Sequence, residues 1–600
     1  MNRNDKLIVA LLVVALMGWL WYSNTLARKA QEQALTEHSV VGAVSTNTAA
    51  TATLAAATNT AAAAGIPPAA VAPAPLPPTV HLLPEETNIL HSADMDLLIS
   101  SRGATLLAAT LPAYRARPAK NSSPVILDFN PQPALALSGL PDVPPDADYS
   151  IRRSTNGTMI LTLVTQHGLC VERTIALRKR HQVLVTDRIT NTSEIPLKVG
   201  ANWITLGTLY RGDSKNDELS VDSYASGPED KVRHWSGELP KLFGGGGFGG
   251  CGGSGRPLQD KAEQTVTGAQ HWVALKSRFF VQAFAPSVAN TSFRVEAVRD
   301  ANKPAFALSH ISGAVAFPGA LLDRGQSIER SYQLYIGPKK LAYLTALDQR
   351  LNEIMEFGFF SWFCKPLVPL LNFFYDHLIP NYGVAIILLT LLVRLIFWPL
   401  THKSTESAKR MRDVQPKIKA IQEQFKEEPH KLQQEIWKVY RENKVNPFSS
   451  CLPMLVQLPV FIALYTVLRS AVELRFAPFL WVADLSEPEN LFVGVLPFAP
   501  NFSLNILPLV MAAVTIVQSK LTPAMGDPAQ QKMMTWMMPL MMLFFFYSMP
   551  AALSLYWTVS TVLAIGQLWW QQRTPKAEVA TVTAATPEQM TRQMRRRMER

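Results

Sequence analysis

The run from Val384 to Leu400, VAIILLTLLVRLIFWPL, constrains the fold more than any other part of the chain. Its length is close to what a helix needs to cross the hydrocarbon core of a bilayer. Backbone groups in lipid have no water to bond, so such a segment must be helical. Only Thr390 and Arg394 in it are strongly polar, and a charge at that depth costs roughly 2.5–3.5 kcal/mol. Arg394 is therefore a candidate functional residue that needs water, a counter-charge or a route to the interface.

Five further segments have a similar length and apolar character. Leu7–Tyr22 follows Arg3 and Lys6, and is either a cleaved signal peptide or a membrane anchor. The aromatic residues at its end favour an anchor, because Trp and Tyr collect at membrane interfaces. The other four segments are Cys451–Leu468, Phe502–Ser519, Met533–Met549 and Ala551–Trp570. The sequence thus predicts a six-span helical membrane part, an N-terminal anchor plus a five-helix core.

The charges of the loops predict the orientation. Residues 402–450 carry eleven Lys and Arg residues, and the tail after Trp570 ends in a cluster of arginines. The loop 469–501 is acid-leaning instead, with Glu473, Asp484, Glu487 and Glu489. The positive-inside rule places the basic loops and both termini in the cytoplasm. Residues 359–375 would invert every later loop if they were a span, so we expect an amphipathic interfacial helix there.

Most of the chain before these core spans is predicted to form an outer β-sandwich. Phe293, Val295 and Ala297 alternate with polar residues, as in a half-buried strand, and Asn156-Gly157 between two such runs is a hairpin signal. Residues 28–80 are Ala, Thr and Pro in bulk and are expected to form a disordered tether. The run Gly244–Gly255 lacks the Gly-Lys-Ser/Thr ending of a phosphate-binding loop, so a flexible loop is favoured.

Catalytic and metal-binding motifs are not found. The eleven His residues are scattered, and neither HExxH nor G-x-S-x-G occurs. We therefore expect no enzyme activity, no cofactor and no metal. The net charge of +11 is consistent with nucleic acid or an anionic membrane surface. The basic residues cluster beside apolar spans, so we expect the positive charge to face an anionic membrane surface and expect no DNA partner. The sequence leaves open whether Cys170 and Cys251 pair.

The segment 402–446 is predicted to be an antiparallel helical hairpin. Val414, Ile418, Ile421 and Phe425 follow a helical spacing, as do Leu432, Ile436 and Val439, and Pro429 separates the two sets. The basic outer face would suit lipid headgroups, ribosomal RNA or a protein partner. A solvated surface without a partner is the alternative.

Several spans contain uncharged polar residues, but none contains an Asp or Glu. They are Thr390, Gln457, Gln518, Thr535, Ser554, Thr558, Ser560 and Gln567. Taken singly, each is best explained by hydrogen bonds between packed helices. Together with Arg394, they favour a hydrated cavity. One span is also crowded with Met, a flexible side chain that suits contact with varied apolar partners.

Four segments carry most of a resemblance to a known family, and they are NYGVAIILLTLLVRLIFWPLT (Asn381–Thr401), QPKIKAIQEQFK (Gln415–Lys426), NPFSSCLPMLVQLPVFIALYTVL (Asn446–Leu468) and VELRFAPFLWVADLSEPE (Val472–Glu489). They strongly resemble the bacterial YidC-type membrane protein insertases of the YidC/Oxa/Alb family. The resemblance implies a multi-domain membrane protein that inserts and folds inner-membrane proteins, alone or with the Sec translocon. The implied layout is a 1–27 anchor, a 28–80 tether, an 81–340 periplasmic β-sandwich, a 341–380 connector, a 381–572 core with the 402–446 hairpin, and a 573–600 tail.

The resemblance also implies a site. Arg394 matches an intramembrane Arg in a hydrophilic groove, and Thr390 and the Tyr556-Trp557 pair match other groove positions. With the polar residues of the spans, the expected groove is Arg394, Thr390, Gln457, Gln518, Tyr556 and Trp557. The expected apolar slide for substrate helices is Met454, Leu458, Phe461, Met537, Met541 and Phe545.

The implied partners are nascent inner-membrane proteins, the Sec translocon, membrane lipids, and a ribosome or targeting factor at the hairpin and basic tail. Two other functions fit the residues. A single Arg among polar groups would suit a transporter or channel for an anionic solute, although no inverted repeat is found. The outer domain could also be a binding module that the spans only anchor, since fold does not give function.

Overall fold

The computed structural model describes residues 84–573, apart from residues 120, 154–156, 213–216, 226–230, 236–238, 240–259, 301–306, 348, 426–427, 444–451, 494–502 and 522–527. The predicted anchor, the tether, the Gly-rich loop and the basic tail lie outside the described residues, as does Cys251. All contacts discussed below lie within one compact unit, residues 79–523 and 535–600.

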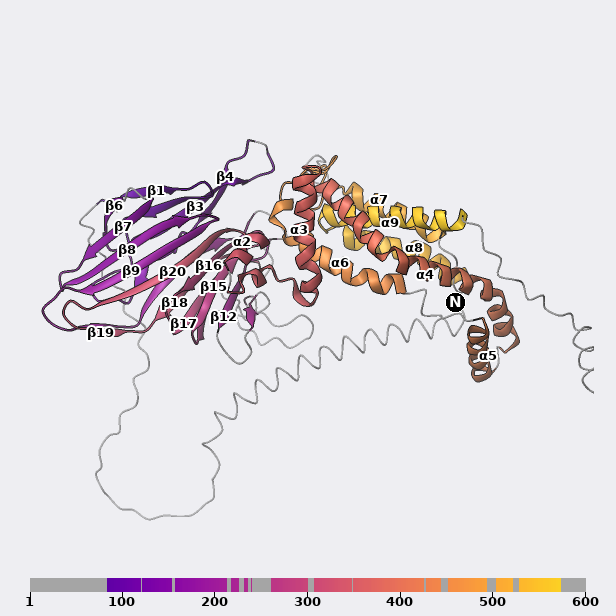
Figure 1. Ribbon diagram of the computed structural model, residues 1–600, viewed down its shortest axis with the longest axis horizontal. Coiled ribbons are helices and arrows are strands. Elements are labelled where there is room, and N and C mark those ends of the chain that lie inside the picture. Colours follow the sequence, from indigo (N-terminus) through magenta and orange to yellow (C-terminus); the bar gives the residue numbers. More distant parts are fainter. Residues whose placement is uncertain are drawn as a thin grey trace, which may run out of the picture. The chain divides into compact units, whose positions relative to one another are not determined.

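Residues 87–338 form an all-antiparallel β-domain (Figure 1). Its strands are β1 (Thr87–His91), β2 (Asp96–Ser100), β3 (Thr105–Arg115), β4 (Pro124–Asp128), β5 (Leu137–Ser138), β6 (Ser150–Arg153), β7 (Thr158–Val164), β8 (Leu169–Arg178), β9 (Gln182–Asn191), β10 (Leu197–Val199), β11 (Asn202–Tyr210), β12 (Ser220–Ala225), β13 (Val232–His234), β14 (Lys261–Thr267), β15 (Gln270–Lys276), β16 (Phe280–Pro286), β17 (Ser292–Arg299), β18 (Leu308–Phe317), β19 (Ala320–Leu322) and β20 (Ser327–Pro338).

Two large sheets face each other across one core. One has nine strands in the order β13-β12-β15-β16-β20-β9-β8-β7-β6, and the other has five, β14-β17-β18-β11-β5. The core contains Val185 and Leu334 from the first sheet and Val295 and Ile311 from the second. A four-stranded sheet, β1-β2-β3-β4, shares this core, and β10 pairs with β19. The strand-rich domain predicted from the sequence is confirmed.

The alternation of apolar and polar residues predicts the faces of individual strands correctly. Phe293, Val295 and Ala297 on β17 are at most 4% exposed, while the residues between them are half-buried. This is the outcome expected when one face of a strand meets the core and the other faces solvent. The strands β6 and β7 pair antiparallel on either side of the Asn156-Gly157 signal. Gly157 has φ +69°, which suits the left-handed conformation of such turns.

Helices follow the β-domain. They are α2 (Leu341–Ala346), the 3₁₀ turns η2 (Leu351–Met355) and η3 (Gly358–Phe360), α3 (Ser361–His377), α4 (Tyr382–Gln424), α5 (Pro429–Glu442), α6 (Leu452–Ser470), η5 (Val472–Leu474), α7 (Ile506–Leu521), α8 (Pro528–Phe546) and α9 (Ala551–Arg573). The segments Tyr382–His402 and Ala551–Gln571 are long and apolar enough to cross a membrane, and shorter apolar helices lie at Pro459–Ser470, Ile506–Leu521 and Thr535–Phe546.

Helix α4 differs from the prediction, because it does not end at Leu400. It continues for 43 residues through Pro399 and Pro416, so the first arm of the expected hairpin is the same helix as the expected span. Helix α5 begins at Pro429, the residue that separates the two apolar sets of the predicted hairpin, and packs against this arm. Val414, Ile418, Leu432 and Val439 are buried, so the predicted apolar seam between the two helices is present.

Helices α4 and α9 run parallel. Arg394 of α4 donates to Ser560 of α9. Thr401 lies seven residues after Arg394, and its hydroxyl accepts a bond from Nε2 of Gln567, which lies seven residues after Ser560, at 3.0 Å. The same increment on both helices requires the same direction. The rings of Trp398 and Trp570 meet in the same interface, with their centroids 5.9 Å apart.

The loop between α6 and α7 packs over the starts of three helices. A Cβ atom at Gly383, near the start of α4, would overlap the ring of Phe479. Leu474, Val482 and Leu485 are at most 2% exposed and belong to the same apolar core as the helices. The backbone N–H groups of Ala551 and Ala552, which begin α9, donate to Glu487 O and Leu485 O, both at 2.9 Å. This loop therefore fixes the ends of helices.

We expect Glu489→Ala to loosen the start of α7. The Glu489 carboxylate accepts the N–H groups of Leu507 at 2.6 Å and Ile506 at 2.9 Å, and Trp481 Nε1 at 3.0 Å. It caps the helix and places a negative charge at the positive end of the helix dipole, which together are worth about 1–2 kcal/mol. Hydrogen exchange of residues 506–510 should accelerate about fivefold to thirtyfold in Glu489→Ala. Glu489→Gln should accelerate it less, because its amide oxygen still accepts one bond. Equal exchange in Glu489→Ala and the wild type would contradict this assignment.

Candidate functional site

Arg394 lies at an interface of α4 and α9, where its described partners are uncharged. Its Nε and Nη2 both donate to the hydroxyl oxygen of Ser560, at 3.0 and 2.8 Å. Among the residues that the structure describes, no carboxylate forms an ion pair with it. A guanidinium has five N–H donors, and these contacts use two of them. Arg394 is half-buried, so the remaining donors can bind water or an acidic group.

A short polar chain extends from Arg394 to a third helix. Tyr556 lies one turn before Ser560 on α9, and Gln457 Nε2 of α6 donates to the hydroxyl of Tyr556. Tyr556 is 2% exposed, and Ser560 is also buried. Each buried polar group thus has a partner, as the interior of a protein requires. The structure brings together three of the six predicted groove residues, Arg394, Tyr556 and Gln457.

The other three predicted groove residues are placed differently. Thr390 is buried, and its hydroxyl donates to Ile386 O of its own helix at 2.6 Å. Trp557 packs in an aromatic cluster, with its ring centroid 5.5 Å from Phe461 and 5.4 Å from Phe546. Gln518 lies half-buried near the end of α7, and it is not among the described partners of Arg394. Ser560 belongs to the site instead. Its position one turn after Tyr556 is the signal that could have identified it.

The predicted apolar slide divides into two parts. Met537, Met541 and Phe545 lie on one exposed face of α8, together with Trp536, Leu540 and Phe544, and all six are 49–78% exposed. Phe461 is half-buried within the aromatic cluster. The side chains of Met454 and Leu458 lie outside the described residues. A row of six large apolar residues on one face suits contact with lipid or with another apolar helix.

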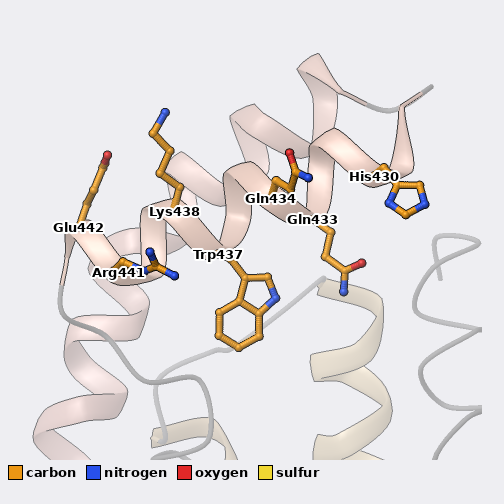
Figure 2. A pocket seen from close by; sticks show the side chains of 7 residues that line it. All are labelled: His430, Gln433, Gln434, Trp437, Lys438, Arg441 and Glu442. Carbon is orange, nitrogen blue, oxygen red and sulfur yellow. The ribbon is translucent and has the colours of Figure 1, made fainter.

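Helix α5 presents a polar outer face. Seven exposed side chains line a hollow on this helix (Figure 2), and they are His430, Gln433, Gln434, Trp437, Lys438, Arg441 and Glu442. The indole of Trp437 is 49% exposed among these polar groups. The buried seam residues lie on the other face of the helix, so this arm of the hairpin is amphipathic in the predicted sense.

Two family models match most of the chain. Residues 373–578 match the model described as 60Kd inner membrane protein, and residues 90–225 and 254–370 match the YidC periplasmic domain. The groove residues lie in the first match, and the β-domain lies in the second. Together the two models cover more than half of the sequence.

Proteins named membrane protein insertase YidC are similar to this chain. One from Syntrophobacter fumaroxidans is 39% identical over 315 residues, which are 52% of this chain and 55% of that protein. The chain thus spans about half the length of this relative. One from Geobacter sp. (strain M21) is 30% identical over 505 residues, 80% of this chain and 85% of that protein.

A solved structure, described as an active YidC insertase crystal structure with the first transmembrane domain resolved, is 18% identical. The alignment covers 82% of this chain and 94% of the chain in that structure, with a TM-score of 0.33. The family models and the sequence relatives decide the assignment: the chain belongs to the YidC membrane protein insertase family of inner-membrane proteins and carries the family's periplasmic domain.

Proposed function

We propose that this protein inserts other membrane proteins into the inner membrane, and that Arg394 receives acidic groups of the segment being moved across. The observation that supports the role of Arg394 is its pairing with a hydroxyl in place of a carboxylate. A charge within an apolar helix normally has a functional reason, because its insertion is unfavourable. Here the cation is held in place by Ser560 and keeps donors for a further acceptor.

The free energy gained from an ion pair with Arg394 is comparable to the cost of holding an acidic residue inside the bilayer. An ion pair at about 4 Å is worth roughly 4 kcal/mol at an effective dielectric constant near 20, before desolvation. An Asp at bilayer depth costs roughly 2.5–3.5 kcal/mol. One Arg in a hydrated groove can therefore offset most of the cost of holding an acidic tail partway across. The apolar helix of the substrate then leaves along the exposed face of α8, and the membrane potential draws the negative tail outward.

The proposed topology has six spans, with both termini in the cytoplasm and the β-domain in the periplasm. Two features support it. Helices α4 and α9 run parallel, as two odd-numbered spans of a five-helix core must. The amphipathic hairpin and the basic tail carry the positive charge expected of cytoplasmic segments. We propose that they contact the ribosome or a targeting factor and the lipid headgroups, and that the Sec translocon works with the protein on larger substrates.

Replacement of Arg394 tests the proposal. Full-length wild type, Arg394→Lys and Arg394→Ala would be reconstituted in lipid vesicles with two versions of one short substrate, with an acidic and a neutral tail. Arg394→Ala should insert the acidic-tailed version about tenfold to a hundredfold more slowly, the range that loss of one charged hydrogen bond implies. Arg394→Lys should retain part of the rate, because it keeps the charge but loses the planar donor geometry.

The neutral-tailed substrate is the control, because its insertion does not need a cation. Its rate should change little in either variant. If wild type and Arg394→Ala insert the acidic tail equally well, Arg394 has no part in substrate binding. An ion current through the purified protein that depends on an anionic solute would instead support a transporter.

A further inference from the structure

Arg278 joins the periplasmic domain to the outer end of the helical core. It lies in the turn between β15 and β16, its side chain is 3% exposed, and its own N–H is held by Asp217 Oδ1 at 2.8 Å. Nε donates to Arg469 O at the end of α6 at 2.8 Å, Nη2 donates to Ser486 O at 2.5 Å, and Nη1 pairs with the carboxylate of Glu487. All three nitrogens of the guanidinium thus bind the helical core. A Lys cannot reproduce this, since only Arg presents donors in a rigid planar fork.

The segment that Arg278 holds is also the segment that begins α9. Leu485 O and Glu487 O accept the N–H groups of Ala552 and Ala551, both at 2.9 Å. Leu485 and Ser486 are fully buried. The backbone of residues 485–487 is therefore fixed between the guanidinium on one side and the first turn of α9 on the other.

Helix α9 leads from this contact to the groove. Tyr556 and Ser560 follow Ala551 by five and nine residues, so the Ser560 hydroxyl lies about 14 Å along the helix axis from the contact. A helix moves as a rigid element over this distance, and a shift at its first turn displaces Ser560 relative to Arg394. Among the described residues, Ser560 is the one side chain that accepts hydrogen bonds from Arg394.

We propose that Arg278 is a positioning residue. By fixing residues 485–487 and the start of α9, it determines the position of the Ser560 hydroxyl, and that hydroxyl orients Arg394. The periplasmic domain thereby controls the geometry of the groove. This inference deepens the proposed function and rests on it. Its prediction is specific, because a misplaced Arg394 impairs substrates with acidic tails more than substrates with neutral ones.

The test uses the full chain in lipid and two readouts. Hydrogen exchange of residues 551–556 reports the contact itself, and insertion of acidic- and neutral-tailed substrates reports its consequence. Arg278→Ala should accelerate exchange at the start of α9 about tenfold to a hundredfold, as expected for loss of a charged hydrogen bond. It should also slow the acidic-tailed substrate severalfold more than the neutral one. Arg278→Lys should recover only part of both effects.

Two further variants keep the result interpretable. Arg294→Ala removes an exposed ion pair of the same domain, Arg294 with Glu263 at 3.4 Å, and should leave both readouts unchanged. Glu487→Gln keeps the shape of the side chain and removes the charge that pairs with Arg278. It should produce the same two changes in smaller size, and it replaces Arg278→Ala in the test if that variant does not fold. Unchanged exchange in α9, or equal slowing of both substrates, would overturn the inference. If Arg394→Ala itself shows no preference between tails, the proposed function fails first and this inference falls with it.

Discussion

Asp187→Ala is expected to destabilise the β-domain by about 3–5 kcal/mol, the usual result of removing one partner of a buried ion pair. Asp187 on β9 and Arg173 on β8 are both fully buried, and they form two parallel bonds, Nε to Oδ1 at 2.6 Å and Nη2 to Oδ2 at 2.7 Å. Arg173 Nη1 also donates to Ala104 O at 2.9 Å and to Leu135 O. The substitution would leave a guanidinium buried in an apolar core without its counter-charge.

Hydrogen exchange of the β8 and β9 amides measures this loss of stability in the full chain. It reports the β-domain alone, whereas a multi-domain protein does not unfold in a single transition. Glu263→Ala is the matched control. It removes an acidic partner of an Arg in the same domain, but in an ion pair that is exposed on both sides, and pairs of that kind contribute at most about 1 kcal/mol. Similar effects of the two substitutions would mean that the buried pair is hydrated or that its loss is absorbed by rearrangement.

The sequence predicts those parts of the fold that depend on local periodicity. The alternation in β17 and the seam at Val414 and Ile418 are present because period two and period 3.6 place apolar residues on one face. The extent of α4 is not predicted, since Pro399 is a normal signal for the end of a helix. The helix continues through it because the residues beyond pack against α5.

The site is predicted only in part, for a physical reason. Arg394 stands out because its cost in lipid is a property of one residue. Its partner is a relation between two helices, and the register of α4 against α9 is not encoded in either helix alone. Ser560 is therefore one of eight equivalent polar candidates in the sequence. Glu487 and Glu489 are similar: their acidity is visible as a topological signal, but their roles at the starts of α9 and α7 follow from how the loop folds.

Leu540→Asp should prevent normal insertion of α8, because the exposed face of this helix is expected to contact lipid. Leu540 is 66% exposed, and its neighbours on the same face are apolar. Replacing a Leu by an Asp near the middle of a span costs about 3–4 kcal/mol, a factor of more than about one hundred in the insertion equilibrium. Ser548, beyond the end of α8, would then fail to reach the periplasm.

Labelling of a Ser548→Cys variant by a membrane-impermeant maleimide measures this, in a full chain whose four native cysteines are replaced by alanine. Ile126→Asp is the control. Ile126 on β4 is 58% exposed, nearly as much as Leu540, but its surface is expected to face water. Its substitution should therefore leave labelling unchanged and cost no more than about 1 kcal/mol. The same exposure of an apolar residue thus has opposite consequences in the two solvents. The Ser548→Cys variant that keeps Leu540 is the reference. If Leu540→Asp is labelled as efficiently as this reference, the α8 face is hydrated or covered by protein. A route for substrate helices along this face into lipid is then excluded.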